Sequence, residues 1–523
     1  MDHFTVTFKP DNRAVSIRAG ATLLQAAEYA GIILNTVCGR KGTCRKCSVF
    51  IELTSETVLA CQYKVSSDLT VTVPHTSRYW KQKILSDGIA ANIQAAPAIL
   101  KTLPTAISAE TNPLFGVAID LGTTTIVAKL FDLTTAALMA TASIANPQIK
   151  YGDDVIARIT HGSTTQGLDQ LHSTIIDGIN QLIAELCTQA NVKANDIYEV
   201  TVASNTTMNH ILLKLPIIQL GQAPYKAHSI QAHDKPAPEI KLNINPAGQL
   251  HTIENIAGFV GSDTVAVAVA VGMDKETQRT LIVDIGTNGE IILGTKDRML
   301  ASSCAAGPAF EGARIDQGSR AVNGAIEAVF INDDDIAIDV IGSIPAQSIC
   351  GSGLLDALAV LLDLGIVDST GRLSTPEGLF PKIAARIVEY NNAPAFALAD
   401  GVVLTQKDVR ETQLAKAAIR TGIALLQKEL QLPDEDIDQI LLAGAFGNYI
   451  RRESALRIGL LPKVPVDKVK FVGNAAATGA QMNLLNFEYR ELSKWLASQI
   501  EYIEIAARKD FQDTFAEALM FDE

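Results

Sequence analysis

Four of the seven cysteines gather near the start of the chain, where they form a candidate metal centre. Cys38, Cys44, Cys47 and Cys61 follow the spacing C-x5-C-x2-C-x13-C. Three closely spaced thiolates and a distant fourth suit a 2Fe-2S cluster, because a glycine-containing loop wraps the cluster while a second segment closes its far side. Zinc is the competing metal, but zinc ribbons usually pair two C-x2-C hooks and this segment has a single one. The spacing predicts a 2Fe-2S cluster held by these four cysteines.

Two similar hairpins form a second set of residues that can do chemistry. FGVAIDLGTTTIVAKLFD begins at Phe115 and TLIVDIGTNGEIILGTKD at Thr280, and each reads as apolar strand, Asp-x-Gly-Thr turn, apolar strand. Such a turn places a carboxylate beside backbone N–H groups and hydroxyls, which suits a phosphate chain and its Mg²⁺. One copy alone favours a plain hairpin, since Asn-Gly turns are themselves hairpin signals. The repetition, followed by LLAGAFGNYI at residues 441–450, favours a nucleotide site.

Three more glycine-rich segments in the second half can turn a strand into a helix: CAAGPAFEGARIDQG at Cys304, ICGSGLLDAL at Ile349 and FVGNAAATGA at Phe471. In the middle segment, Gly351, Ser352 and Gly353 precede an amphipathic helix. This position suits a phosphate or ribose at the helix N-terminus, and tight packing is the alternative. The chain has no G-x-x-x-x-G-K-[ST] motif, so an ordinary P-loop is excluded.

Several elements must position these residues. At 523 residues the chain predicts roughly two to four domains. FTVTFK, AVSI, SVFIEL and DLTVTVP read as strands and TLLQAAEYAG as a helix, so residues 1–75 form a small sheet on one helix. Prolines interrupt alanine-rich stretches at 76–113, which predicts a linker that contains a helix. Residues 114–275 and 276–523 then carry one hairpin each.

Composition limits the partners and the location. A net charge of −13 and a pI near 5.2 argue against binding to nucleic acid or an anionic membrane, both of which need a basic surface. The N-terminus shows no secretory signal, and no stretch reaches the ~18 apolar residues of a membrane span. We therefore expect a cytoplasmic protein, whose scattered remaining cysteines give no disulfide framework.

Both chemical regions resemble known families. The N-terminal order resembles the β-grasp (α+β) of ferredoxins, with the C-x5-C-x2-C spacing of adrenodoxin-like members. The two hairpins and LLAGAFGNYI resemble the phosphate-1, phosphate-2 and adenosine motifs of the superfamily of actin, Hsp70 chaperones, sugar kinases and acetate kinase. In that superfamily two ribonuclease-H-like α/β domains clasp ATP. The resemblance implies a multidomain fold: a ferredoxin domain, a linker and two such domains.

The resemblance also assigns site residues. The first hairpin would face the phosphates and Mg²⁺ with Asp120, Gly122, Thr123 and Thr124. The second hairpin would face them with Asp284, Gly286, Thr287, Asn288 and Gly289. Gly444 and Gly447 would let the backbone approach the adenosine. We expect cofactor contacts from these residues and from Gly351, Ser352 and Gly353, and we predict no nucleophile–base pair.

Taken whole, the chain resembles the reductive activases of corrinoid enzymes. NPQIKYGDDVIARI, ASNTTMNHILL, AGPAFEGARI, GSGLLDAL and IEYIEIAARKDFQDTF look like recurring stretches of that family. The resemblance implies an ATP-hydrolysing enzyme that reduces Co(II) to Co(I) through its cluster and serves methyl transfer such as O-demethylation. It implies a corrinoid protein of a methyltransferase system as partner, a ferredoxin or flavoprotein as electron donor, and a homodimer.

Three alternatives remain open from the residues alone. A small-metabolite kinase with a redox-regulatory ferredoxin domain would turn over ATP only with an acceptor. A nucleotide-controlled redox sensor would bind ATP without reducing a corrinoid. An activator of 2-hydroxyacyl-CoA dehydratases would share a 4Fe-4S cluster between subunits and would not need this cysteine set.

Overall fold

The computed structural model describes residues 3–30, 32, 34, 42, 47–74, 77, 88–89, 93–103, 113–286, 288–444 and 450–522. Four of the predicted site residues, Cys38, Cys44, Thr287 and Gly447, lie outside these ranges. Within the described ranges, no helix combines the length and the apolar character needed to cross a membrane.

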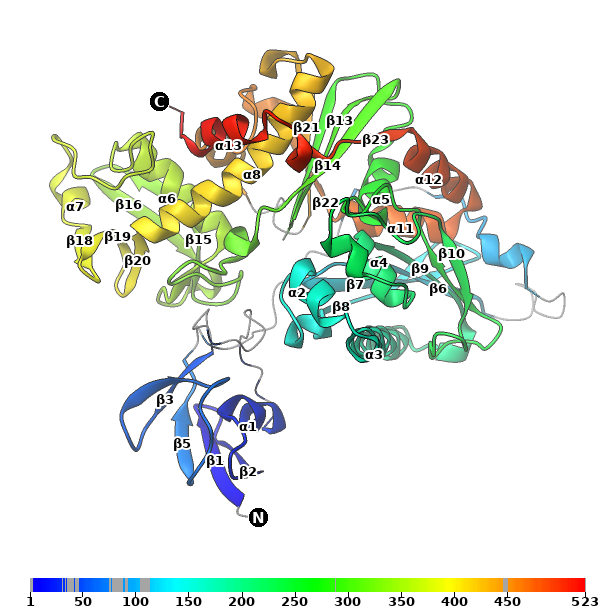
Figure 1. Ribbon diagram of the computed structural model, residues 1–523, viewed down its shortest axis with the longest axis horizontal. Coiled ribbons are helices and arrows are strands. Elements are labelled where there is room, and N and C mark those ends of the chain that lie inside the picture. The colour runs from blue at the N-terminus through cyan, green and yellow to red at the C-terminus, as the bar shows by residue number, and fades with distance from the viewer. Residues whose placement is uncertain are drawn as a thin grey trace.

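The N-terminal unit is a β-grasp, as predicted (blue in Figure 1). Its sheet has the order β2-β1-β5-β3-β4 and packs against α1 (Leu23–Tyr29). The strands are β1 (His3–Lys9), β2 (Arg13–Arg18), β3 (Ser48–Ile51), β4 (Glu56–Leu59) and β5 (Leu69–Thr72). Alternation in β1 turns Val6 and Phe8 into the core. The sequence analysis missed β4, because its ETVL segment is partly exposed and has no alternating apolar pattern.

Each predicted Asp-x-Gly-Thr hairpin begins a six-stranded sheet. The first sheet has the order β10-β11-β9-β6-β7-β8. Its strands are β6 (Phe115–Leu121), β7 (Thr125–Asp132), β8 (Leu138–Ala145), β9 (Ile197–Ser204), β10 (His233–Pro236) and β11 (Gln249–Thr252). β6, β7 and β8 form an antiparallel meander, and β9 joins β6 in parallel.

The second sheet repeats this plan with the order β22-β21-β12-β13-β14-β23. Its strands are β12 (Thr280–Ile285), β13 (Gly289–Thr295), β14 (Arg298–Cys304), β21 (Gln439–Ala443), β22 (Val469–Gly473) and β23 (Ile500–Tyr502). An antiparallel meander of β12, β13 and β14 is again followed by parallel strands, β21 and β22. Five strands therefore follow the same plan in both sheets, so the echo between the hairpins reflects a repeated fold; the sixth strand differs, since β10 pairs with β11 and β23 pairs with β14 at the other edge.

Helices cover both sheets (Figure 1). They are α2 (Val155–His161), α3 (Thr165–Ala190), α4 (Thr206–Leu212), α5 (Ser262–Val271), α6 (Gly351–Asp363), α7 (Pro381–Ala384), α8 (Gln406–Leu430), α10 (Arg452–Arg457), α11 (Ala475–Leu485), α12 (Phe487–Gln499) and α13 (Phe511–Leu519). α3 packs on β8, and α8 packs on β13 and β14. Two small sheets lie between β14 and α8 in sequence. Their strands are β15 (Ala325–Asn332), β16 (Asp335–Val340), β17 (Ser348–Ile349), β18 (Ile387–Tyr390), β19 (Ala393–Ala399) and β20 (Val402–Thr405).

One hydrophobic core joins the two large sheets. It contains Ala118 of β6 and Ile282 of β12, together with apolar residues of α5 and α11. The two helices pack closely because their residues are small: a Cβ on Gly479 would lie 2.1 Å from the Ala266 carbonyl oxygen. α11 also contacts β6 and β9, so this late segment packs on the first sheet. α5 and α11 therefore connect the two halves of the protein through this common hydrophobic core.

The described part of the segment 76–113 is attached to the same helices. Ala96 donates a backbone hydrogen bond to Leu485 and accepts one from Phe487. The ammonium of Lys101 lies 3.0 Å from the centre of the Phe487 ring, and Ile99 is buried. Its regular structure is a 3₁₀ turn, η2 (Ala98–Lys101), where the sequence suggested a helix. The described residues 93–103 of the predicted linker therefore pack as a strap against α11 and α12.

Gly88 is an earlier attachment point of this strap. It forms a bridge with Gly473 at the end of β22. A Cβ on Gly88 would lie 2.4 Å from both the Asn474 carbonyl oxygen and the Thr478 hydroxyl, so only glycine fits without rearrangement. The strap therefore reaches the loop between β22 and α11.

Candidate functional sites

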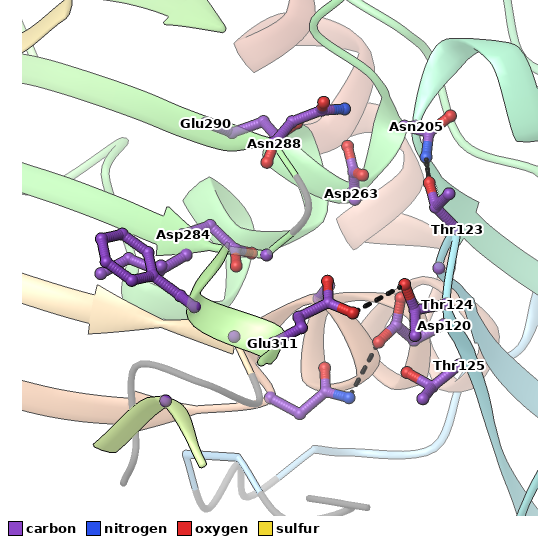
Figure 2. A pocket seen from close by; sticks show the side chains of 18 of the residues that line it. Asp120, Thr123, Thr124, Thr125, Asn205, Asp263, Asp284, Asn288, Glu290 and Glu311 are labelled. Carbon is purple, nitrogen blue, oxygen red and sulfur yellow. Dashed lines mark hydrogen bonds between the residues drawn. The ribbon is translucent and has the colours of Figure 1, made fainter. Parts of the chain in front are cut away.

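A single cleft between the two large sheets collects most of the predicted nucleotide residues (Figure 2). Those that line it are Asp120, Gly122, Thr123, Thr124, Asp284, Gly286, Asn288, Gly351, Ser352 and Gly444. Gly289 and Gly353 are not among its lining residues. A Cβ on Gly289 would approach Ile419 at 2.9 Å, and one on Gly353 would approach the Ile326 carbonyl oxygen at 2.3 Å. The structure gives these two glycines a packing role.

The turn between β6 and β7 is held from behind by two buried polar residues. Asn146 donates through its side chain to the Gly122 carbonyl at 2.9 Å. Arg158, which is 0% exposed, donates to the Thr123 carbonyl at 2.5 Å. Because both carbonyls are engaged behind the turn, the Thr123 and Thr124 side chains remain on the cleft side. The stretch NPQIKYGDDVIARI is thus a support for this turn.

Asn205 joins helix capping to the cleft. Its side-chain oxygen accepts from the Met208 N–H at 2.9 Å and caps α4, as its position before the helix predicts. Its amide group donates to the Thr123 hydroxyl at 2.9 Å, and the residue lines the cleft. One side chain therefore both caps α4 and lines the cleft.

Carboxylates converge in the cleft from both halves. Burial raises the pKa of Asp120 to about 6, opposed by a hydrogen bond from Asn474. Burial and the nearby Asp263 and Asp120 raise the pKa of Asp284 to about 7. Burial, with Asp120 nearby, raises the pKa of Asp263 to about 7. These carboxylates hold protons near neutral pH because they are buried, they crowd together and their negative charges are not offset by positive ones. Carboxylate oxygens are ligands that suit Mg²⁺, so the cluster fits a magnesium ion.

Gly444 fixes the position of Asp284. It has a φ of +85°, and a Cβ at this position would lie 2.3 Å from Asp284 Oδ1. The backbone at the end of β21 thus packs directly on the Asp284 carboxylate. The remainder of the predicted adenosine motif, including Gly447, lies outside the described residues.

The sequence analysis missed several side chains of the cleft, and the charged or amide-bearing ones among them are Asp263, Glu290, Glu311, Arg320 and Asn474. Asp263 was detectable in principle, because it is the charged residue in the small apolar run SDTVAVAVAV of α5. Glu290 likewise follows the Asn-Gly turn at the start of an apolar strand. Glu311 ends a short 3₁₀ turn, Asn474 is the N-cap of α11 and Arg320 lies in a loop, and at such positions no sequence period indicates which way a side chain faces.

The described cysteines of the N-terminal motif lie together at one end of the β3–β4 hairpin. The Ala60 N–H donates to the Cys47 carbonyl at 3.0 Å, so the segments before β3 and after β4 are paired. Cys47 and Cys61 are both buried. The Gln62 amide donates to Cys61 Sγ at 3.5 Å. Two buried cysteines on paired segments, one of them with an amide donor to its sulfur, fit an iron-sulfur cluster.

Comparison with known proteins identifies all three parts of the chain. Residues 4–75 match the 2Fe-2S iron-sulfur cluster binding domain family. Residues 115–276 match the RACo middle region, and residues 278–523 match the C-terminal ASKHA domain of RACo. The corrinoid activation enzyme RamQ of Eubacterium limosum is 33% identical, with 94% of each chain covered. This chain belongs to the corrinoid activation protein family.

Two further relatives agree with this assignment. The Co(II) methylated amine-specific corrinoid protein reductase of Methanosarcina barkeri is 26% identical, covering 71% of this chain and 70% of the relative. The solved structure of a reductive activator for a corrinoid, iron-sulfur protein superposes with a TM-score of 0.72 and 31% identity, covering 99% of this chain and 98% of the other. A 2Fe-2S domain and an ASKHA ATPase unit are therefore combined here as in that family.

Proposed function

We propose that this protein uses ATP to reduce the cobalt of a corrinoid protein from Co(II) to Co(I), in the service of methyl transfer such as O-demethylation. The observation that carries the proposal is one chain that combines a cysteine pair suited to a cluster with a two-sided carboxylate cleft. Similarity to corrinoid activators along 94% of the chain supports the same reaction class.

The chain's own residues have distinct tasks in this proposal. When bound, the cluster supplies one electron at a time and MgATP supplies free energy. Asp120 and Asp284, which face the cleft from opposite sheets, would bind the Mg²⁺, and the Thr123 and Thr124 hydroxyls would donate to the phosphate chain. Gly351 and Ser352 at the N-terminus of α6 add backbone N–H groups and a favourable helix dipole. Nucleotide binding thereby contacts both halves at once.

Nucleotide can assist the reduction only by changing which state is favoured. For a one-electron step, every ~59 mV of mismatch costs a factor of ten in the equilibrium. A ligand shifts an equilibrium by its difference in affinity for the two states. A triphosphate that contacts both sheets favours the arrangement of the two halves in which it can make both sets of contacts. We assign this arrangement to the state that binds the Co(II) protein.

The proposal includes a ferredoxin or flavoprotein as electron donor, a homodimer and a cytoplasmic location. These parts rest on the sequence and on the family resemblance.

The decisive experiment follows the visible spectrum of cobalt. Reduced protein is mixed with a Co(II) corrinoid protein, with and without MgATP, and the Co(I) band is recorded. We expect Co(I) to accumulate with MgATP and to fail to accumulate with Asp120→Ala or Asp284→Ala. If cobalt were reduced equally without nucleotide, the role of ATP in the proposal would be wrong. If cobalt were not reduced under any condition, the corrinoid protein would not be the substrate.

A further inference from the structure

The segment that joins β14 to the two small sheets folds back over the cleft. The 3₁₀ turn η6 (Pro308–Glu311) lies between two glycines in the left-handed region, Gly307 and Gly312, each with a φ of 74°. A Cβ on Gly312 would lie 2.2 Å from the Ser319 carbonyl oxygen. The chain therefore doubles back at Gly312, which brings the residue before it close to the residue after Ser319.

This fold brings Glu311 and Arg320 together at the wall of the cleft. Arg320 Nη2 lies 3.7 Å from Glu311 Oε2, and each side chain is 17% exposed. Both residues line the cleft. The ion pair is largely buried but faces the cavity, so a ligand that enters the cleft can replace one partner of the pair.

The same Glu311 oxygen also contacts the opposite half of the protein. The Thr124 hydroxyl donates to Glu311 Oε2 at 3.3 Å, across 187 residues of sequence (Figure 2). Thr124 belongs to the turn after β6, and Glu311 follows β14 of the second sheet. One carboxylate oxygen thus holds a cation from its own half and a hydroxyl from the other half.

The charge balance of the cleft gives Arg320 a special position. Among the lining residues that the structure describes, it is the one cation, beside five carboxylates. A triphosphate brings more negative charge than one Mg²⁺ offsets, and the planar fork of guanidinium matches phosphate oxygens. A terminal phosphate would compete with Glu311 for Arg320 and for the Thr124 hydroxyl.

We propose that Arg320 binds the terminal phosphate of ATP in exchange for Glu311, so that the Glu311–Thr124 contact is made without ATP and broken with it. Arg320 is then the residue that distinguishes ATP from ADP, and Glu311 is a latch between the two halves. This inference rests on the proposed function, because it requires ATP in this cleft.

Binding measurements by titration calorimetry test the assignment with adenylyl imidodiphosphate, which is not hydrolysed, and with ADP, both with Mg²⁺. We expect Arg320→Ala to weaken the triphosphate analogue by about 10- to 100-fold, the range of a charged hydrogen bond, while ADP binding changes by less than about 3-fold. Arg320→Lys keeps the charge but not the fork, so it should restore part of the preference.

Glu311→Gln separates the latch from a merely structural role. Because it removes the anion that competes for Arg320, it should tighten binding of the triphosphate analogue and leave ADP unchanged. Arg314→Ala is the matched control, since Arg314 lies on the same segment, is 62% exposed and pairs with Glu411. That variant should bind both nucleotides as the wild type does.

Each other outcome contradicts the inference. Equal weakening of both nucleotides by Arg320→Ala, or no change in either, would show that Arg320 does not read the terminal phosphate. Weaker analogue binding by Glu311→Gln would show that Glu311 supports the nucleotide and does not compete with it. A wild type that binds neither nucleotide would overturn the proposed function and this inference together, whereas wild-type binding with an unaffected Arg320→Ala would overturn this inference alone. Thermal unfolding and the cluster absorption spectrum check that each variant is folded.

Discussion

Asn474 donates a side-chain hydrogen bond of 2.8 Å to Asp120 across 354 residues of sequence. The same side chain caps α11 by accepting from the Ala477 N–H at 2.8 Å. One residue therefore connects the first hairpin, the helix at the shared base of the two sheets, and the loop on which Gly88 is seated. Its amide opposes the rise in the pKa of Asp120, so it favours the ionised carboxylate that a metal requires.

Two substitutions at this residue separate its roles. Asn474→Asp keeps a capping carboxylate but loses the donor to Asp120, whereas Asn474→Ala loses both and should cost about 1 kcal/mol of stability through the cap. We expect both variants to bind MgATP about tenfold more weakly, since a charged hydrogen bond is worth roughly 1.5 kcal/mol or more. Calorimetry gives the affinity, and thermal unfolding should show a loss for both variants, from the lost cap in the alanine variant and from the new carboxylate beside Asp120 in the aspartate variant. Unchanged affinity in both variants would contradict a role for the donor.

Gly444→Ala should displace Asp284. The new Cβ would lie 2.3 Å from the carboxylate oxygen, and the positive φ adds strain of about 1 kcal/mol or more. Gly401→Ala is the matched control, because Gly401 has a φ of 74° and open space around its Cβ position. Both variants should lower the unfolding temperature, but only Gly444→Ala should reduce Mg²⁺-dependent nucleotide binding. Equal binding losses would assign the effect to backbone strain alone.

Metal binding should release protons. Asp120, Asp263 and Asp284 have pKa values raised to about 6 or 7, and Mg²⁺ favours their ionised forms. The folded, metal-free protein therefore holds more protons than the metal complex near neutrality. Affinity for MgATP should rise as pH increases through about 6 to 7, and then level off.

Titration in two buffers of different ionisation enthalpy measures the number of protons released. Asp263→Asn, which removes one of the three groups, should reduce that number. Proton uptake on binding would contradict this assignment.

The same raised pKa values also affect folding of the metal-free protein. The stability that they contribute is complete at pH values below the unfolded pKa near 4, and it is lost as pH rises to about 7.

The cysteine prediction can be tested apart from nucleotide binding. Cys47→Ser and Cys61→Ser should lose the visible absorption and the low-temperature electron paramagnetic resonance signal of a reduced 2Fe-2S cluster, and Cys38→Ser and Cys44→Ser should do the same. Cys187→Ser, on α3, is the control and should keep the full signal. MgATP binding should persist in all five variants. A cluster retained in Cys61→Ser would require a different fourth ligand.

The fold and half of the cleft could be predicted because their signals are local. The residues of β1 and β2 alternate between apolar and polar, and the turns at Asp120 and Asp284 repeat one motif. Each of these signals lies within a short continuous segment of sequence. The segment at Cys304 illustrates the limit: its glycines suggested a strand-to-helix turn, but the structure has the short η6 and a chain that doubles back. Which side chains then enter the cleft depends on packing between elements far apart in sequence, and no local period records it.

The strap that carries Gly88 also limits how far the iron-sulfur domain can travel. Fourteen residue steps separate Pro74, at the end of that domain's sheet, from Gly88, and a fully extended chain of this length spans at most about 50 Å. A reactive centre tethered at this distance has an effective concentration on the order of millimolar at its target. Dilution of the protein should therefore leave the internal electron-transfer rate constant unchanged, and a separately added iron-sulfur domain would compete only at millimolar concentrations.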